Sequence, residues 1–205
     1  MAGLSRGSMS IRPILVIPDD KLRQKTEKVG AIDSDLQTLI DDMFETMYAA
    51  PGIGLAAPQV GIMKRLAVVD VSKRDDEQVP LALINPQVTW SSEEMSVYEE
   101  GCLSIPEYYE EVERPAKIRV AFTDREGKRH EIEADGVLAT CIQHEIDHLD
   151  GVLFIDHISK LKRDMVWKKA VKTFKRDGPQ TYTPVPGPKA PPPDDGDDIL
   201  NIGEL

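Results

Sequence analysis

The most regular hydrophobic pattern in the chain lies between Ser34 and Ala50. Its apolar residues recur at intervals of three and four, which places them on one face of an α-helix. They are Leu36, Leu39, Ile40, Met43, Phe44 and Met47. Asp33 or Ser34 can cap the start of this helix, and Pro51-Gly52 stops it.

Shorter patterns downstream are typical of strands. Arg65–Val71 and Leu81–Trp90 are rich in β-branched and other apolar residues, and Pro86 is expected to break the second strand or confine it to a sheet edge. Apolar and polar residues alternate in "KIRVAFTD", which is typical of a strand. A turn is predicted at "DREG", and the second strand of the hairpin at "KRHEIEAD". "GIGLAAPQVG", ahead of these strands, is expected to be a loop.

Two more helices are predicted in the C-terminal half. One runs from about Val137 to Leu149, with Asp135 as its cap and Gly151 at its end. The other, Lys160–Arg176, is basic and amphipathic, and "VLFIDHI" between them is expected to be a short strand. We therefore predict an α+β fold, with mostly antiparallel sheets packed around the central helix 137–149 and flanked by N-terminal and C-terminal helices.

The composition bounds this picture. A chain of 205 residues is long enough for one domain with its own core, which we expect over residues 9–177. Residues 1–8 are expected to be a disordered leader or tag, and the Pro/Asp-rich residues 178–205 a disordered or extended acidic tail. The sequence has neither a long apolar run nor a secretory signal, and its two cysteines do not require an oxidising compartment. We therefore expect a cytoplasmic protein with no membrane association.

The charge is negative overall but unevenly distributed. A net charge of -11 argues against general nucleic-acid binding. Lys160–Arg176 is nevertheless strongly basic, and it runs directly into the acidic segment 177–205.

The candidate chemistry lies in "QHEIDHLDG". On a helix, His144 and His148 face the same way, so both can bind one metal ion. Glu145, one residue further on from His144, can then act as a general base, which is the logic of an HExxH motif. The alternative is an ordinary amphipathic helix that carries two histidines.

A catalytic site of this kind also needs a third protein ligand. His130 is expected to be a solvent-facing residue of the hairpin, and His157 follows an apolar stretch rather than an open turn. Cys141 lies one helical turn before His144 and is expected to be a small wall residue. Cys102, in the loop-like "YEEGCLSIPEYYEEVERP", is either a structural cysteine or a thiolate that a metal stabilises.

Three segments taken together resemble the peptide deformylase family. They are "GIGLAAPQ" (Gly52–Gln59), "EGCLS" (Glu100–Ser104) and "QHEIDHL" (Gln143–Leu149), in that order and with similar spacing. The resemblance runs from about Ile14 to the last helix, so it makes residues 9–177 a single catalytic domain.

The resemblance implies a metal-dependent hydrolase that removes the N-formyl group from the N-terminal methionine of new polypeptides and releases formate. The resemblance implies that one divalent metal ion is bound by Cys102, His144 and His148, with water in the fourth position. It also implies that Glu145 is the acid–base residue. The resemblance leads us to expect Fe(II) in the cell, with Zn, Ni or Co in purified protein. This ligand set alone does not choose among them.

The resemblance also implies how substrate is bound. The Gln59 amide and the Leu103 backbone N–H stabilise the oxyanion. Residues expected to contact the peptide are Ile53, Gly54, Glu100, Gly101, Tyr109, Val137 and Cys141. Many family members have an arginine soon after "EGCLSIP", where this chain has Tyr109. We therefore expect a changed sequence preference beyond methionine.

Family members use a C-terminal helix near the ribosomal exit tunnel. Here the lysines and arginine of 168–176 are the candidates for contact with RNA phosphates, unless they form only a solvated helix face: Lys168, Lys169, Lys172, Lys175 and Arg176. We expect a monomer.

Two rival functions share parts of the pattern. An HExxH peptidase that cuts internal peptide bonds does not account for "EGCLS" or "GIGLAAPQ". A metal-stapled binding module would close its metal with four protein ligands, including His157 or Cys141.

Overall fold

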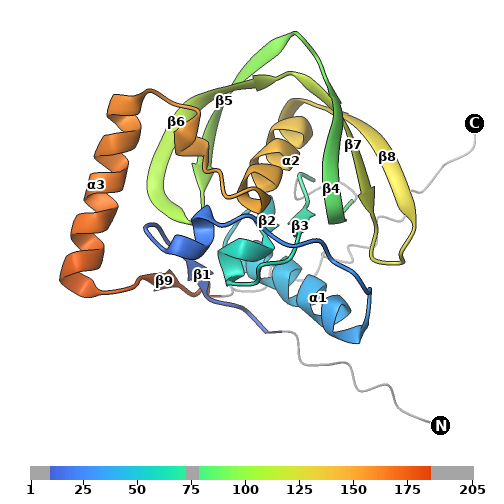
Figure 1. Ribbon diagram of the computed structural model, residues 1–205, viewed down its shortest axis with the longest axis horizontal. Coiled ribbons are helices and arrows are strands. Elements are labelled where there is room, and N and C mark those ends of the chain that lie inside the picture. Colours follow the sequence, from blue (N-terminus) through green and yellow to red (C-terminus); the bar gives the residue numbers. More distant parts are fainter. Residues whose placement is uncertain (1–9, 73–78, 186–205) are drawn as a thin grey trace, which may run out of the picture.

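The computed structural model describes residues 10–72 and 79–185, so the expected leader and most of the expected acidic tail lie outside the described residues. Three α-helices are present in this part of the chain: α1 (Ser34–Ala49), α2 (Gly136–Leu149) and α3 (Lys160–Asp177). They combine with antiparallel sheets into a mixed α/β fold (Figure 1). The predicted helices are confirmed within two residues at each end.

The main sheet has five antiparallel strands in the order β2-β3-β4-β7-β8. Their bounds are β2 (Gly54–Ala56), β3 (Leu66–Val69), β4 (Leu81–Ser91), β7 (Lys117–Thr123) and β8 (Arg129–Asp135). The strands predicted in Arg65–Val71 and Leu81–Trp90 and the β7–β8 hairpin are confirmed. Pro86 neither breaks β4 nor places it at an edge, because the pairing with β7 shifts register between Ile84 and Gln87 and so forms an irregularity around the proline.

Helices cover both faces of this sheet. The alternation of β3 turns Val68 toward a core built with α1 and Val69 toward a core built with α2. All four residues of β3 are therefore buried, which explains why its sequence is uniformly apolar rather than alternating. Asp33 caps α1 by accepting a hydrogen bond from the Leu36 N–H at 2.9 Å.

A separate two-stranded sheet was not expected. β5 (Met95–Cys102) and β6 (Ile105–Pro115) form a long antiparallel hairpin that arches over α2 (Figure 1). The expected loop around Cys102 is thus the end of a strand. The prediction missed it because glutamates occupy successive positions of both strands, so no apolar alternation is visible.

Two other segments differ from expectation. "GIGLAAPQVG" is not simply a loop, because Gly54–Ala56 pairs with β3 as β2 and Ala57–Val60 forms the 3-10 helix η2. "VLFIDHI" is not a strand, because Phe154–Asp156 forms the 3-10 helix η3 and buries Phe154 and Ile155 in a third core. A short apolar run does not distinguish these conformations.

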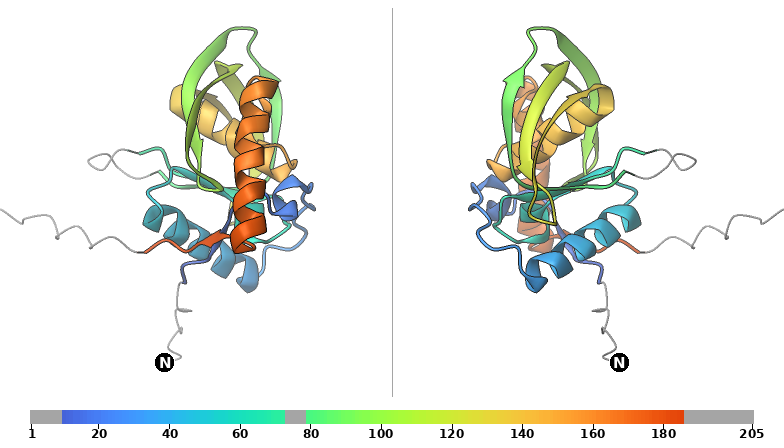
Figure 2. Two further views of the ribbon diagram at one scale, coloured as in Figure 1. Left: turned by 90° about the vertical axis from the view of Figure 1, so that its left-hand side faces the viewer. Right: turned by 90° about the vertical axis from the view of Figure 1, so that its right-hand side faces the viewer.

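The ends of the described chain meet. β1 (Ile14–Leu15) pairs antiparallel with β9 (Thr181–Tyr182), and the 3-10 helix η1 (Asp20–Arg23) follows β1. The helix α3, which precedes β9 in the chain, lies along one side of the molecule and packs against η3 (Figure 2). β9 belongs to the segment expected to be a tail. Within residues 10–72 and 79–185, none of the helices combines the length and apolar composition that crossing a bilayer requires.

Gly151 gives a prediction about stability. Its φ is +75°, and a Cβ there would lie 2.6 Å from the carbonyl oxygen of Arg23. Gly151→Ala should therefore lower the free energy of unfolding by about 3 kcal/mol, because backbone strain and a clash with rigid backbone add. Gly127→Ala is the matched control, since Gly127 has a φ of +85° but its nearest neighbour is 3.8 Å away. The Gly127→Ala substitution should lower the free energy of unfolding by only about 1 kcal/mol. If urea titrations show that both variants lose the same free energy of unfolding, the predicted clash at Gly151 is wrong.

Candidate metal centre and active site

Three potential metal ligands from two distant segments meet in the structure. Cys102 ends β5, while His144 and His148 project from α2, and the ligand atoms of these three residues lie within 4.8 Å of one another. The Cys102 Sγ is 3.2 Å from the His148 Nε2. A register shift between Gly101 and Cys102 accompanies the end of the strand, a feature that re-aims side chains.

The other candidate ligands lie elsewhere. His130 stacks on Phe122 and its Nε2 is 2.5 Å from the Asp124 carboxylate. His157 is bonded to Asp147 at 2.8 Å. The Cys141 thiol is 3.5 Å from the carbonyl oxygen of Ile53, to which it donates. None of the three belongs to the ligand group.

The two cysteines differ in ionisation. Burial acts to raise the pKa of Cys102, but the imidazoles of His148 and His144 outweigh it and lower the pKa to about 5. Burial and the nearby Glu145 carboxylate instead raise the pKa of Cys141 well above its ordinary value. Only Cys102 is therefore prepared to be a thiolate, the form that binds metal. One thiolate and two imidazoles suit Zn, Fe, Co or Ni, so the residues present fit a divalent transition metal.

A buried ion-pair network supports His144. The Glu100 carboxylate lies 2.9 Å from the His144 Nδ1, which leaves the Nε2 of His144 for a metal. Arg114 donates to Glu100 at 2.6 Å and to Asp147 on α2 at 2.7 Å. Burial alone would raise the pKa of Glu100, but hydrogen bonds from His144 and Arg114 hold it below the ordinary value.

Sequence reasoning placed Glu100 beside the substrate and missed Arg114. Glu100 does line the cavity described below, but its carboxylate is engaged by His144 and Arg114. The pairing joins residues 14 positions apart that face each other only once the β5–β6 hairpin forms. No local pattern in the sequence signals it.

Glu145 has a different environment from Glu100. Its side chain is buried, and its Oε2 has no hydrogen-bond partner among the described residues. Burial is the largest effect and raises the pKa of Glu145 to about 7, although His144 and His148 oppose it. A carboxyl group with this pKa can both accept and return a proton near neutral pH. A Cβ at Gly54 would overlap the Glu145 carboxylate, so this glycine makes room for it.

Gln59 lies on η2 beside the ligands. Its Oε1 accepts a hydrogen bond from the Ala56 N–H at 2.8 Å. Its Nε2 is 3.2 Å from the Ser104 Oγ and 3.6 Å from the Cys102 Sγ. The amide is therefore held with its NH₂ group toward Cys102.

One cavity of about 560 Å³ lies beside these groups. Every residue expected to contact substrate lines it: Ile53, Gly54, Glu100, Gly101, Tyr109, Val137 and Cys141. Gln59, Leu103, Cys102, His144 and Glu145 line it as well. The cavity thus joins a buried set of polar groups to a wall that includes half-exposed apolar side chains such as Ile53 and Val137.

Comparison with known proteins identifies the family to which this chain belongs. A family model described as Polypeptide deformylase matches residues 11–164. A protein of Rhizobium meliloti (strain 1021) named peptide deformylase is 62% identical over 170 residues, covering 83% of this chain and 98% of that protein. One from Methylocella silvestris with the same name is 59% identical and covers 82% and 88%.

Solved structures agree. The crystal structure of a peptide deformylase from Legionella pneumophila matches with a TM-score of 0.74 at 47% identity, covering 82% of this chain and 96% of that one. The Ehrlichia chaffeensis enzyme, solved in complex with actinonin, matches with a TM-score of 0.76 at 42% identity, covering 82% and 99%. The chain belongs to the polypeptide deformylase family, and it is a metal-dependent hydrolase that removes the N-formyl group from the N-terminal methionine of newly made polypeptides.

Proposed function

We propose that Cys102, His144 and His148 hold the catalytic metal ion and that Glu145 moves the protons of the reaction. When bound there, a divalent ion supplies Lewis-acid chemistry, which polarises a carbonyl group and lowers the pKa of water. The resemblance to the family favours Fe(II) in the cell, with Zn, Ni or Co in purified protein. The observation that carries the proposal is the buried Glu145 carboxylate, which has no hydrogen-bond partner in the described part of the chain. It lies beside the three-ligand cluster, of which Cys102 and His144 line the same cavity.

Glu145 has two tasks in this scheme. Its carboxylate accepts a proton from water as the water oxygen attacks the formyl carbon, and it then gives that proton to the departing amine nitrogen. The same group can do both because its pKa is raised to about 7, mainly by burial. Formate and a free N-terminal amine result.

Gln59 and Leu103 stabilise the negative oxygen that develops at the formyl group. The Ala56 N–H holds the Gln59 amide by its oxygen, so the NH₂ group is oriented before substrate arrives. Leu103 lines the cavity in the turn that follows Cys102. One preorganised donor of this kind is worth roughly 3 kcal/mol of transition-state stabilisation.

The methionine side chain occupies an apolar slot beside α2. Val137 and Cys141 form part of its wall, and Ile53 and Gly54 lie along the peptide backbone. Tyr109 stands where the resemblance leads us to expect an arginine, and its ring covers Gly101, at which a Cβ would lie 2.5 Å from the ring. The peptide beyond methionine therefore meets an aromatic face rather than a cation.

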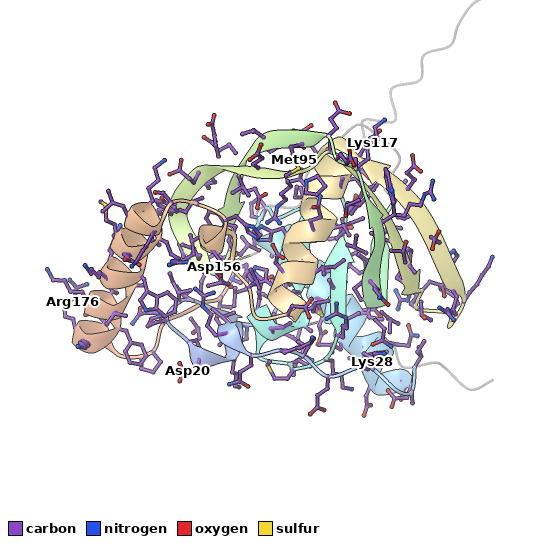
Figure 3. All side chains as sticks on the ribbon, turned by 45° about the horizontal axis from the view of Figure 1, so that its top comes forward. Asp20, Lys28, Met95, Lys117, Asp156 and Arg176 are labelled. Atoms are coloured by element: carbon purple, nitrogen blue, oxygen red, sulfur yellow. The ribbon has the colours of Figure 1, made fainter. Side chains whose placement is uncertain are left out.

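We also propose that the exposed basic side of α3 contacts ribosomal RNA, and that the enzyme works as a cytoplasmic monomer. The basic residues of this helix are exposed: Lys168, Lys169, Lys172, Lys175 and Arg176. Arg176 projects at the outer end of α3 (Figure 3). An exposed row of cations suits phosphates, which charged contacts bind without reading sequence.

Glu145→Gln tests the catalytic assignment. It should lower kcat on a formyl-Met tripeptide by about 10³-fold, because the acid–base group is lost while the ligands remain. Metal content, measured by elemental analysis, should stay that of the unmodified protein. An acetyl-Met tripeptide is the substrate control and should not be turned over. Full activity in Glu145→Gln would refute the assigned role, and cleavage of internal peptide bonds would favour a peptidase.

Glu100→Gln tests the support of His144. Loss of the carboxylate should weaken metal affinity by about 10- to 100-fold, because the ring is no longer oriented by a charged acceptor. Chelator competition against Co(II)-loaded protein measures this directly. Glu133→Gln is the matched control, since Glu133 pairs with Arg119 at 3.2 Å on the exposed surface and should leave the affinity unchanged. Equal affinities for both variants would remove Glu100 from the metal centre.

Charge reversal tests the ribosome contact. Lys168→Glu with Lys172→Glu places two negative charges on one face of α3 and should abolish co-sedimentation with ribosomes at low salt. Lys117→Glu with Lys128→Glu changes the same charge at exposed positions of β7 and the following turn and should leave binding intact. If both double variants co-sediment with ribosomes to the same extent, the basic side of α3 is only a solvated helix face.

A further inference from the structure

One wall of the substrate cavity comes from beyond the last helix. Tyr182 lies on β9 and lines the cavity, although sequence reasoning placed it in the tail. Its position is set by pairing with β1, where Ile14 lies opposite Tyr182 and Leu15 opposite Thr181. Figure 1 shows β9 returning from the end of α3 to lie beside β1.

β1 connects this strand to the catalytic segments. Ile14 is fully buried, and β1 packs against η2, which carries Gln59. Two residues past β1, the Ile17 N–H donates to the carbonyl oxygen of Ser104 at 3.0 Å, just after Leu103. Tyr182 is therefore attached to the same framework that holds the groups assigned to the oxyanion.

The cavity wall is rich in tyrosine. The chain has five tyrosines, and Tyr98, Tyr108, Tyr109 and Tyr182 line this cavity. Tyr109 is 65% exposed and Tyr182 is 41% exposed, so both offer ring surface at the open side. Tyrosine supplies a large contact area at a small entropy cost, because its side chain has few rotatable bonds.

Carboxylates accompany these rings. Glu99 and Glu107 line the cavity and are exposed to solvent, and none of the described lining residues is a lysine or an arginine. Ring faces and carboxylates both attract cations. The inner end of the cavity holds the buried Glu145 carboxylate, which has no hydrogen-bond partner within residues 10–72 and 79–185. The formyl group therefore enters there, and the following residues of the peptide meet the exposed side.

We propose that Tyr182 is a further substrate-contacting residue, which binds the peptide downstream of formyl-Met and favours a lysine or arginine side chain there. This inference rests on the proposed use of the cavity as the peptide site. The substrate class is thus a formyl-Met peptide with a basic residue soon after methionine. An acidic residue at the same place is repelled by Glu99 and Glu107, the exposed carboxylates that line the same cavity.

The test compares kcat/KM for formyl-Met-Ala-Lys-Ser, formyl-Met-Ala-Glu-Ser and the dipeptide formyl-Met-Ala, using the full-length metal-loaded enzyme. The unmodified enzyme should prefer the lysine peptide over the glutamate peptide. Tyr182→Ala should reduce that preference about fivefold, mainly through KM, and should cost more on the lysine peptide than on the dipeptide. Tyr182→Phe should retain the preference for the lysine peptide, because the ring face remains.

Thr181→Ala is the matched control, since Thr181 is an exposed neighbour on the same strand whose side chain points to the opposite face. It should keep the unmodified preference. Equal turnover of the lysine and glutamate peptides by the unmodified enzyme would overturn the inference, as would an equal loss on all three peptides in Tyr182→Ala. Absence of deformylation of every peptide would instead refute the proposed function of the site.

Discussion

The structure depends on a buried arginine that joins the β5–β6 hairpin to α2. Arg114 is 4% exposed and bonds Glu100 on the hairpin and Asp147 on the helix. Arg114 and Glu100 are buried and Asp147 is partly exposed, so at least two charges are removed from water. That is costly, and only close, hydrogen-bonded geometry offsets the cost. Because the pairing holds the end of β5 against α2, it brings the Cys102 thiolate to the two histidines.

The same network divides the two buried glutamates of the site into different roles. Glu100 is held ionised by Arg114 and His144, so it can orient a metal ligand. Glu145 has no such partner among the described residues, and burial raises its pKa to about 7. The surroundings alone thus keep one carboxyl group of the cavity ionised and give the other a pKa near neutral pH.

The main sheet supplies the other side of the cavity. Burial of β3 on both faces anchors β2, its neighbour, which presents Gly54 to the Glu145 carboxylate. η2 follows directly and presents Gln59. The rigid sheet, the helix and the hairpin therefore each contribute one part of the site, and β1 with β9 adds Tyr182 to its wall.

The sequence alone determined the features that depend on neighbours along the chain. The apolar stripe of α1, the β7–β8 hairpin and the placement of His144, Glu145 and His148 on one helix all follow from local periodicity. The metal ligand upstream, Cys102, was reached only through resemblance to a family, because nothing in its own segment distinguishes a ligand from a structural cysteine.

Only the tertiary structure decided the rest. The β5 and β6 strands show no apolar alternation because glutamates occupy many of their positions, so the sequence did not predict them. The short apolar run at Phe154 was compatible with both a strand and a 3-10 helix. The pairing of Glu100 with Arg114 joins residues 14 positions apart, and the pairing of Tyr182 with β1 joins the two ends of the described chain. Such contacts depend on which surfaces meet after folding, and no local pattern of residue types encodes that.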